Sequence, residues 1–387
     1  MAWVYTSPRT IVFGREALEY VEQIEGERVL VITDRTMQRL GLLELLLGHL
    51  KGRQVQVFSD VEPEPSLETA RRAARAAQAF SPNLIISLGG ASCTDVAKSA
   101  WLFYERPELD FKDLTPSEPL GLGRKAKLVA IPTTSGPGSE ASWAIVLTSP
   151  EEKRKLEFGN RDLVPLVTIL DPALPLRAPA QLLASTGSDG VAEGIEAYIS
   201  KWTNEFTKAL AARGLELLFR YLPLACSDRK DLQAQEKVHI ASALLGLAFS
   251  NSQVGLIHAM GHALGGLYKI QHGRTLTPVF KQALQYTLPE AREDLAELAY
   301  HLRIAGDSEE ARAKGLIGEA VLLFKRLGMP LSLQELGIPR AAFERDLPEL
   351  VTRAQESTGL FVSPRVPDER ELARLFLYAY EGRDVDF

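Results

Sequence analysis

Two short stretches of this 387-residue chain concentrate the side chains that could bind a metal ion. His258, His262 and His272 follow the spacing H-x3-H-x9-H, so three of the six histidines fall within fifteen residues. Upstream, Asp189 and Glu193 are four positions apart, which places both carboxylates on one face of a helix. Carboxylates and imidazoles together suit a divalent transition metal such as iron, zinc or manganese. Because a bound metal can polarise a substrate oxygen, the pattern favours metal-assisted catalysis.

Each part of this pattern also has a plain structural explanation. Asp189 and Glu193 could belong to a solvated acidic face together with Glu196. A single histidine on a helix rich in alanine, glycine and leucine is usually a hydrogen-bonded core residue. The joint occurrence still argues for a metal, because burying several such groups without partners costs several kcal/mol.

A second candidate site follows a predicted strand near residue 88. The apolar run L-I-I-S-L leads directly into G-G-A-S-C-T-D-V-A-K, which begins a helical stretch. Gly89 and Gly90 allow a phosphate to approach the backbone closely, the helix start offers free N–H groups, and Ser92 adds a hydroxyl. An ordinary tight turn between strand and helix is the alternative.

Two further loops could contact a nucleotide. Asp34 ends the first predicted strand, where an acidic residue commonly binds ribose hydroxyls and repels the 2′-phosphate of NADP. Asp34 could instead be a helix N-cap. The loop I-P-T-T-S-G-P-G-S-E, with Thr133 and Thr134, could line a cofactor groove or be a plain connection.

Strand-like and helical patterns alternate over the first 170 residues and predict a mostly parallel sheet. The expected strands are Arg28–Thr33, Gln54–Phe58, Leu84–Leu88, Lys127–Ile131 and Leu166–Leu170, and Leu67–Phe80 is an expected helix.

After Asp171 a proline-rich connector, D-P-A-L-P-L-R-A-P, precedes a region in which only helical spacing occurs. The expected helices are Thr186–Lys201, Thr207–Tyr221, Ala234–Ser250, Leu256–Leu267, Leu288–Ile304 and Glu309–Leu327. We therefore expect an α/β nucleotide-binding domain over residues 1–180 and an all-helical domain that binds metal and substrate over residues 181–387.

Composition excludes several classes of function. The net charge of −6 and the pI near 5.7 argue against nucleic-acid or membrane partners. The two cysteines make no disulfide framework, and apolar runs stay short of the roughly eighteen residues that a membrane span needs. We read no signal peptide at the start, and expect a cytoplasmic protein.

Four motifs resemble those of the iron-containing (group III) alcohol dehydrogenases. G-G-A-S-C-T-D-V-A-K is similar to that family's G-G-G-S-x-x-D-x-A-K, and P-T-T-S-G-P-G-S-E to P-T-T-x-G-T-G-S-E. T-G-S-D-G-V-A-E-G-I-E-A-Y-I-S resembles T-G-x-D-A-L-x-H-A-I-E-A-Y-x-S. G-L-I-H-A-M-G-H-A-L-G-G-L-Y-K-I-Q-H-G resembles G-x-x-H-A-M-A-H-x-L-G-x-x-Y-x-x-P-H-G. The motifs occur in the family's order over most of the chain.

The resemblance implies an N-terminal Rossmann-like domain, a C-terminal helical domain, and an enzyme that interconverts a small alcohol with its aldehyde or ketone. The implied metal ligands are Asp189, Glu193, His258 and His272, and His262 is implied near the substrate as the candidate proton relay. The implied cofactor contacts are Asp34, Gly89, Gly90, Ser92, Asp95, Thr133, Thr134 and Lys155. We expect NAD rather than NADP, Fe2+ before Zn2+, and a homodimer.

Glu193 departs from the family pattern, which has histidine at that position, and it adds a negative charge that favours a harder cation. Three alternatives stay open: a zinc polyol dehydrogenase of the glycerol dehydrogenase type, a lyase resembling dehydroquinate synthase and, because of Glu193, a metal-free nucleotide-binding relic. Ala91 and Pro137 are milder departures in the phosphate loop and the threonine loop.

Overall fold

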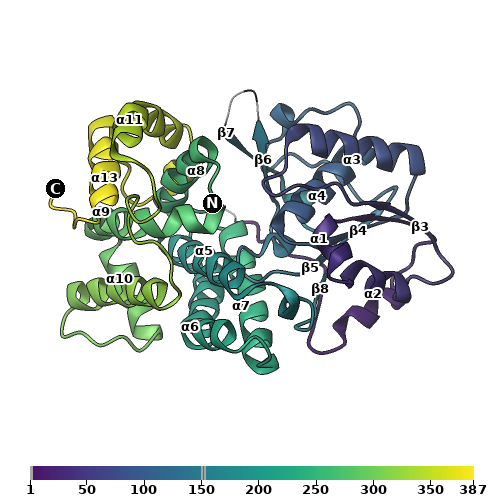
Figure 1. Cartoon of the computed structure of the whole chain (residues 1–387), viewed down its shortest axis with the longest axis horizontal. Helices are drawn as coiled ribbons and strands as arrows, with labels where there is room; N and C mark the ends of the chain where they lie inside the picture. Colours follow the sequence, from purple (N-terminus) through teal and green to yellow (C-terminus); the bar gives the residue numbers. More distant parts are fainter. Residues whose placement is uncertain (1–2, 150, 152–153) are drawn as a thin grey trace.

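The computed structural model describes residues 3–149, 151 and 154–387, and it consists of a sheet-containing half and a helical half (Figure 1). The main sheet has six parallel strands in the order β1-β8-β5-β4-β2-β3. The strands are β1 (Thr10–Phe13), β2 (Arg28–Ile32), β3 (Gln54–Phe58), β4 (Leu84–Gly89), β5 (Lys127–Pro132) and β8 (Val167–Leu170). All expected strands are present, and β1 is an additional one.

Helices cover both faces of this sheet, as expected for parallel strands. Alternate residues of β2 belong to opposite cores: Val29 and Val31 pack with α2 (Leu42–His49), whereas Leu30 and Ile32 pack with α3 (Leu67–Phe80) and α4 (Ala91–Glu105). The short helix α1 (Arg35–Arg39) follows β2. This arrangement places the ends of β2, β4 and β5 at one edge of the sheet.

A separate antiparallel hairpin, which the sequence analysis did not anticipate, joins the two halves. Its strands are β6 (Ala144–Ser149) and β7 (Arg154–Gly159), and they contact α4 and α8 (Leu256–Tyr268), respectively (Figure 1). The hairpin therefore carries side chains of the sheet half into the neighbourhood of the predicted metal-binding helix.

Every regular element after residue 179 in the described chain is a helix. Besides α8, these are α5 (Ala180–Ile199), α6 (Glu205–Ser227), α7 (Leu232–Ser250), α9 (His272–His301), α10 (Glu309–Arg326), α11 (Arg340–Gln355), α12 (Gly359–Val362) and α13 (Glu369–Glu381). They enclose the largest hydrophobic core of the chain. Across the described residues, we find no helix with the length and apolarity required to cross a bilayer.

The expected start of α9 at Leu288 is wrong, because this helix already begins at His272 and continues through Pro278 and Pro289. The residues around the first proline, among them Val279 and Phe280, are fully buried. The prolines cannot donate backbone hydrogen bonds, and the packing of these buried residues offsets the resulting loss of helix stability. The early start brings His272 to the first turn of the helix.

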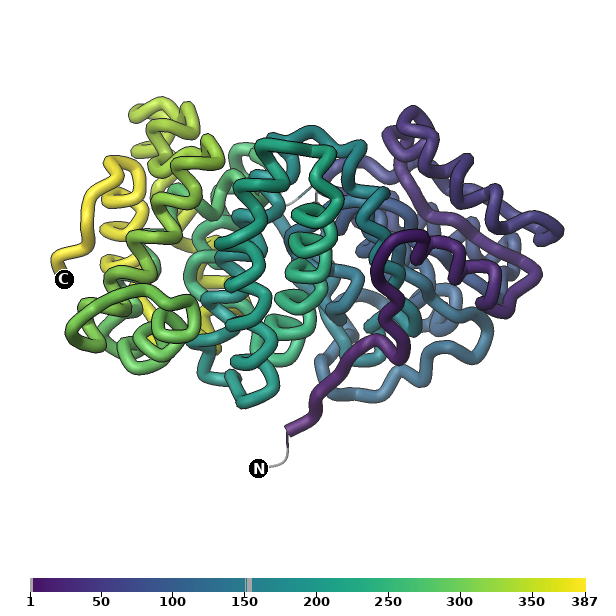
Figure 2. Tube along the Cα trace, turned by 90° about the horizontal axis from the view of Figure 1, so that it is seen from below, coloured from purple at the N-terminus to yellow at the C-terminus, as the bar shows by residue number. Residues whose placement is uncertain are grey.

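Two connections fix the halves against each other. The loop after β5 enters the helical half, where Gly136 N donates to Ser242 Oγ (2.8 Å) and Thr186 Oγ1 donates to Ser135 O (2.6 Å). At the N-terminus, Thr6 exchanges hydrogen bonds of 2.7 and 2.9 Å with the Asn251 side chain on the helical half. Figure 2 shows this segment leaving the sheet half. The division into functional domains at residue 180 stays a prediction, although α5 begins there.

Candidate active site

Three of the predicted metal ligands converge between α5, α8 and the start of α9. Asp189 Oδ1 lies 3.4 Å from His258 Nε2 and 3.6 Å from His272 Nε2. One ligand atom from each of the three residues lies within 4.8 Å of the others. Residues that are far apart in the sequence therefore present one carboxylate and two imidazoles to a common point.

The donor set fits a divalent transition metal. Asp189 Oδ1 and His258 Nε2 are buried and have no hydrogen-bond partner in the described part of the chain. Two ligand atoms held about 2.1 Å from one tetrahedral ion lie roughly 3.4 Å apart, which matches the observed separations. A cation at this point would satisfy both atoms, whereas an ordinary hydrogen-bonded cluster leaves them unsatisfied.

Glu193 lies on the same helix but outside this group. Among the described residues, the candidate metal cluster comprises Asp189, His258 and His272 alone. The Glu193 carboxyl is buried, and burial together with the charges of Asp189, Glu140 and Glu196 raises its pKa well above the usual range. Its role as a fourth ligand stays a prediction. Without a nearby cation, burial and the neighbouring negative charges disfavour the ionised form of this carboxyl.

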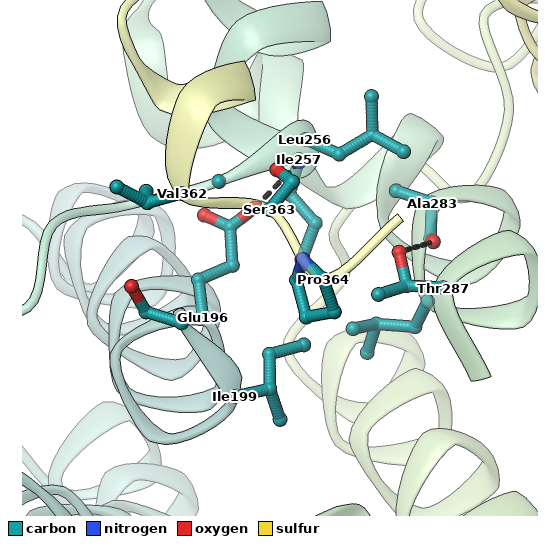
Figure 3. Close-up of a pocket in the computed structure, with 12 residues that line it drawn as sticks. Glu196, Ile199, Leu256, Ile257, Ala283, Thr287, Val362, Ser363 and Pro364 are labelled. Atoms are coloured by element: carbon teal, nitrogen blue, oxygen red, sulfur yellow. Dashed lines mark hydrogen bonds between the residues drawn. The ribbon is translucent and has the colours of Figure 1, made fainter. Parts of the chain in front are cut away.

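Glu196 holds His258 from the side opposite the cluster. His258 Nδ1 contacts Glu196 Oε2 at 2.5 Å. Ile257 N donates to Glu196 Oε1 at 2.6 Å, as Figure 3 shows. Burial acts against the charged imidazole, but Glu196 and Asp189 raise the pKa of His258 to about 9. A carboxylate on Nδ1 orients a metal-binding histidine and makes Nε2 the ligand atom.

The alternative of a solvated acidic face is wrong, because Asp189, Glu193 and Glu196 are all at most 4 % exposed. The position of Glu196 at the site could have been predicted from the sequence, because it follows Asp189 by seven positions and so lies on the same helix face. Behind Glu196 lies a cavity of only about 10 Å³, bordered by Ile199 and Pro364 (Figure 3). This space holds about one water molecule, so a substrate does not enter there.

His262 lies beside the cluster. Its ring centroid is 4.8 Å from that of His272 and 5.8 Å from that of His258. His262 Nδ1 contacts the Glu157 carboxylate of β7. Sequence reasoning missed Glu157, because it lies on the unpredicted hairpin. His262 thus combines a position next to the metal ligands with a fixed orientation.

A pocket of about 200 Å³ opens over His262. Its lining is formed by Lys155, Leu156, Glu157, Phe158, His262, Ala263, Arg353, Glu356, Ser357 and Thr358. Lys155 is nearly buried and forms an ion pair of 2.6 Å with Glu64. Most of these side chains are polar, so the pocket suits a polar ligand next to the metal cluster.

The predicted phosphate loop has the expected geometry. Gly89 adopts φ +155°, and a Cβ built there would lie 2.4 Å from Cys93 Sγ, so a larger residue does not fit. Gly90 is the N-cap of α4, and no described side chain caps this helix. Ser92 lies in the first turn and is half-buried. The first N–H groups of α4 are therefore suited to bind a phosphate.

Asp34 is the N-cap of α1, and its contact with the cofactor stays a prediction. Its Oδ1 caps α1 by accepting from Thr36 N (2.6 Å) and Met37 N (3.0 Å). Its Oδ2 lies on the side of the phosphate loop, 3.5 Å from Cys93 Sγ. The second oxygen therefore places a negative charge next to Gly89.

The remaining predicted cofactor residues lie near the same edge. Thr133 N donates to Gly89 O (2.9 Å), and a Cβ on Gly90 would lie 3.2 Å from Thr134 Oγ1. Asp95 is buried and accepts from Val146 N (3.1 Å). Burial raises its pKa to about 7 despite Lys98 nearby. Asp95 thus attaches α4 to the hairpin, an observed structural role beside the predicted contact with the cofactor.

Comparison with known proteins matches both halves of the chain to one family. Residues 8–172 match the model "Iron-containing alcohol dehydrogenase", and residues 183–380 match "Fe-containing alcohol dehydrogenase family, C-terminal". The chain belongs to the iron-containing alcohol dehydrogenase family. As a member of this family, the chain is an oxidoreductase that interconverts alcohols with aldehydes or ketones, and the family implies a divalent metal and NAD(P).

Relatives of this alcohol dehydrogenase differ in length. The NADPH-dependent butanol dehydrogenase of Clostridium saccharobutylicum is 33 % identical, and the alignment covers 99 % of each chain. An aldehyde-alcohol dehydrogenase of Streptococcus pneumoniae is also 33 % identical, but this chain spans only 46 % of its length. A solved structure of a 1,3-propanediol oxidoreductase superposes with a TM-score of 0.91 at 32 % identity, covering 98 % of this chain and all of that one. These comparisons confirm the expected fold.

Proposed function

We propose that this enzyme interconverts a short alcohol or diol with its aldehyde, that it prefers NAD to NADP, and that its metal is Fe2+. The convergence of Asp189, His258 and His272 beside His262 is the observation that carries the proposal. The neighbouring pocket of about 200 Å³ suits a small polar substrate better than a long apolar one. The relatives named for butanol and 1,3-propanediol support this substrate class.

In the proposed reaction, Asp189, His258 and His272 hold the metal, Glu193 lies at or near a fourth position, and Glu196 fixes the His258 ring. A bound divalent cation supplies Lewis-acid polarisation of the substrate oxygen. NAD supplies the hydride acceptor. His262 moves the proton of the hydroxyl group between substrate and solvent. The proposed NAD contacts are Asp34, Gly89, Gly90, Ser92, Asp95, Thr133, Thr134 and Lys155.

The position of Asp34 supports a preference for NAD over NADP, although one relative is named as NADPH-dependent. Its Oδ2 lies beside the phosphate loop, where a 2′-phosphate would meet a carboxylate. The two free cysteines fit a reducing compartment. Location in the cytoplasm and assembly as a homodimer stay predictions.

A substrate screen tests this function. Purified enzyme loaded with Fe2+ or Zn2+ is assayed for NADH formation with ethanol, butanol, 1,3-propanediol and glycerol, and for NADH consumption with the matching aldehydes. We expect turnover of the short alcohols or diols with Fe2+. Activity confined to glycerol with zinc would favour the polyol dehydrogenase, and a lack of net NADH formation with every alcohol would contradict the proposal.

A further inference from the structure

Glu157 lies where three separate segments of the chain meet. It belongs to β7 of the hairpin, and it contacts His262 on α8 together with residues just after α11. Its carboxylate accepts from Ser357 Oγ (3.2 Å) and Thr358 Oγ1 (2.6 Å) in addition to contacting His262 Nδ1. Three donors surround one carboxylate, so the side chain has a single well-defined position.

The carboxylate stays ionised in this position. Burial alone would raise its pKa, but the positive charge of a protonated His262, together with hydrogen bonds from His262, Thr358 and Ser357, lowers the pKa of Glu157 to about 2. An ionised carboxylate can only accept hydrogen bonds. His262 Nδ1 must therefore carry a proton and donate it to Glu157.

This assignment determines the role of the second ring nitrogen. In a neutral imidazole one nitrogen is the donor and the other the acceptor, so a protonated Nδ1 leaves Nε2 with the lone pair. The ring lines the 200 Å³ pocket and lies 4.8 Å, between centroids, from His272. Nε2 is then the nitrogen available to a substrate next to the metal cluster.

We propose that Glu157 is a positioning residue that holds His262 in the Nδ1–H form, so that Nε2 takes the hydroxyl proton of the alcohol. The role depends on the proposed function. In the oxidation, bound NAD would accept the hydrogen of the C–H bond with its electron pair as hydride. The O–H proton moves to His262 Nε2 as the carbonyl forms, and the imidazolium then releases a proton to solvent.

The matched variants are Glu157→Leu and the double variant Ser357→Ala/Thr358→Val. The first removes the carboxylate, whereas the second removes two of its hydrogen bonds and leaves the contact with His262. Nitrogen-15 NMR of labelled histidine, with the His262 signals assigned by their loss in His262→Asn, reports the tautomer without substrate. We expect one Nδ1–H form in the wild type and the double variant, and a mixture in Glu157→Leu. A mixture in the wild type would overturn the proposal.

Kinetics separate positioning from a purely structural role. Glu157→Leu should lower kcat about 10–100-fold, with KM for NAD within about threefold of the wild type. The double variant should lose much less kcat, and because both residues line the pocket, its main effect should fall on KM for the alcohol. Because Glu157 acts through His262, adding Glu157→Leu to the His262→Ala variant should lower kcat little further than His262→Ala alone does. Glu157→Gln can still accept a hydrogen bond from His262 Nδ1, so its kcat should be higher than that of Glu157→Leu. This variant keeps the test valid if Glu157→Leu misfolds.

Equal losses of kcat in Glu157→Leu and the double variant, or full additivity of the kcat losses of Glu157→Leu and His262→Ala, would overturn the positioning role. A wild type without NAD-linked activity would instead overturn the proposed function.

Discussion

Asp189 Oδ1 and His258 Nε2 lie 3.4 Å apart, buried, and without a hydrogen-bond partner among the described residues. Two orphaned acceptor or donor atoms at this separation are unfavourable in a folded core. They become favourable when both bind one cation, and His272 contributes the third ligand from the start of α9. The metal ion is therefore expected to stabilise the fold as well as to act in catalysis.

Replacing Glu196 should weaken metal binding without removing a ligand. Glu196→Ala deletes the carboxylate that contacts His258 Nδ1 at 2.5 Å, so the imidazole can rotate and change its tautomer. We expect the affinity for the metal to fall about 10–100-fold in a competition titration with a chelator. Glu196→Gln keeps an acceptor and should lose less. Wild-type affinity in Glu196→Ala would show that His258 needs no such support.

Glu193 offers a direct test of the fourth ligand position. If it joins the metal on binding, Glu193→Ala should weaken the metal affinity by at least about tenfold, and Glu193→His should restore it. The buried carboxyl with its raised pKa provides the reason, because a nearby cation removes the cost of ionising it. An unchanged metal affinity in Glu193→Ala would show that Glu193 is not a ligand and that the protein binds the metal through Asp189, His258 and His272 alone.

Asp34 should determine the choice of cofactor. A 2′-phosphate near its carboxylate is repelled by roughly 1–4 kcal/mol at about 4 Å, depending on the effective dielectric constant. Asp34→Asn removes the charge but keeps a good N-cap for α1. We expect this variant to raise kcat/KM with NADP about tenfold or more, at nearly unchanged Tm. Equal kcat/KM for NAD and NADP in the wild type would refute the assignment.

Glu157 should make the enzyme sensitive to acid. Its pKa is about 2 in the folded protein, below the ordinary value of 4.5, so it stabilises the fold above the ordinary value. That stability is lost as the pH falls from about 4.5 towards 2. Allowing for partial exposure, we expect the wild type to lose about 1 kcal/mol more than Glu157→Gln between about pH 6 and pH 3.5. Urea unfolding of both proteins at the two pH values measures this difference in stability. Equal losses of stability in the wild type and Glu157→Gln would contradict the lowered pKa.

The sequence predicted the sheet well, and it named Asp189, His258 and His272, which the structure brings together. Both results depend on local patterns, and metal binding by these residues stays a prediction. Buried strands such as β4 are continuous apolar runs, and His258 lies in a short motif. Glu157 could not be predicted, because its role arises from contacts with residues 105 and about 200 positions away. The start of α9 was missed for a similar reason, since core packing overrides two prolines.

Metal content measured together with activity tests the central claim most directly. Wild type, His272→Ala and His301→Ala are purified in parallel, and iron and zinc are determined by mass spectrometry alongside NADH formation. His301 lies exposed at the far end of α9 and serves as the control. We predict about one divalent metal per chain and full activity in the wild type and His301→Ala, with both lost together in His272→Ala. Full activity in a metal-free preparation would contradict the account.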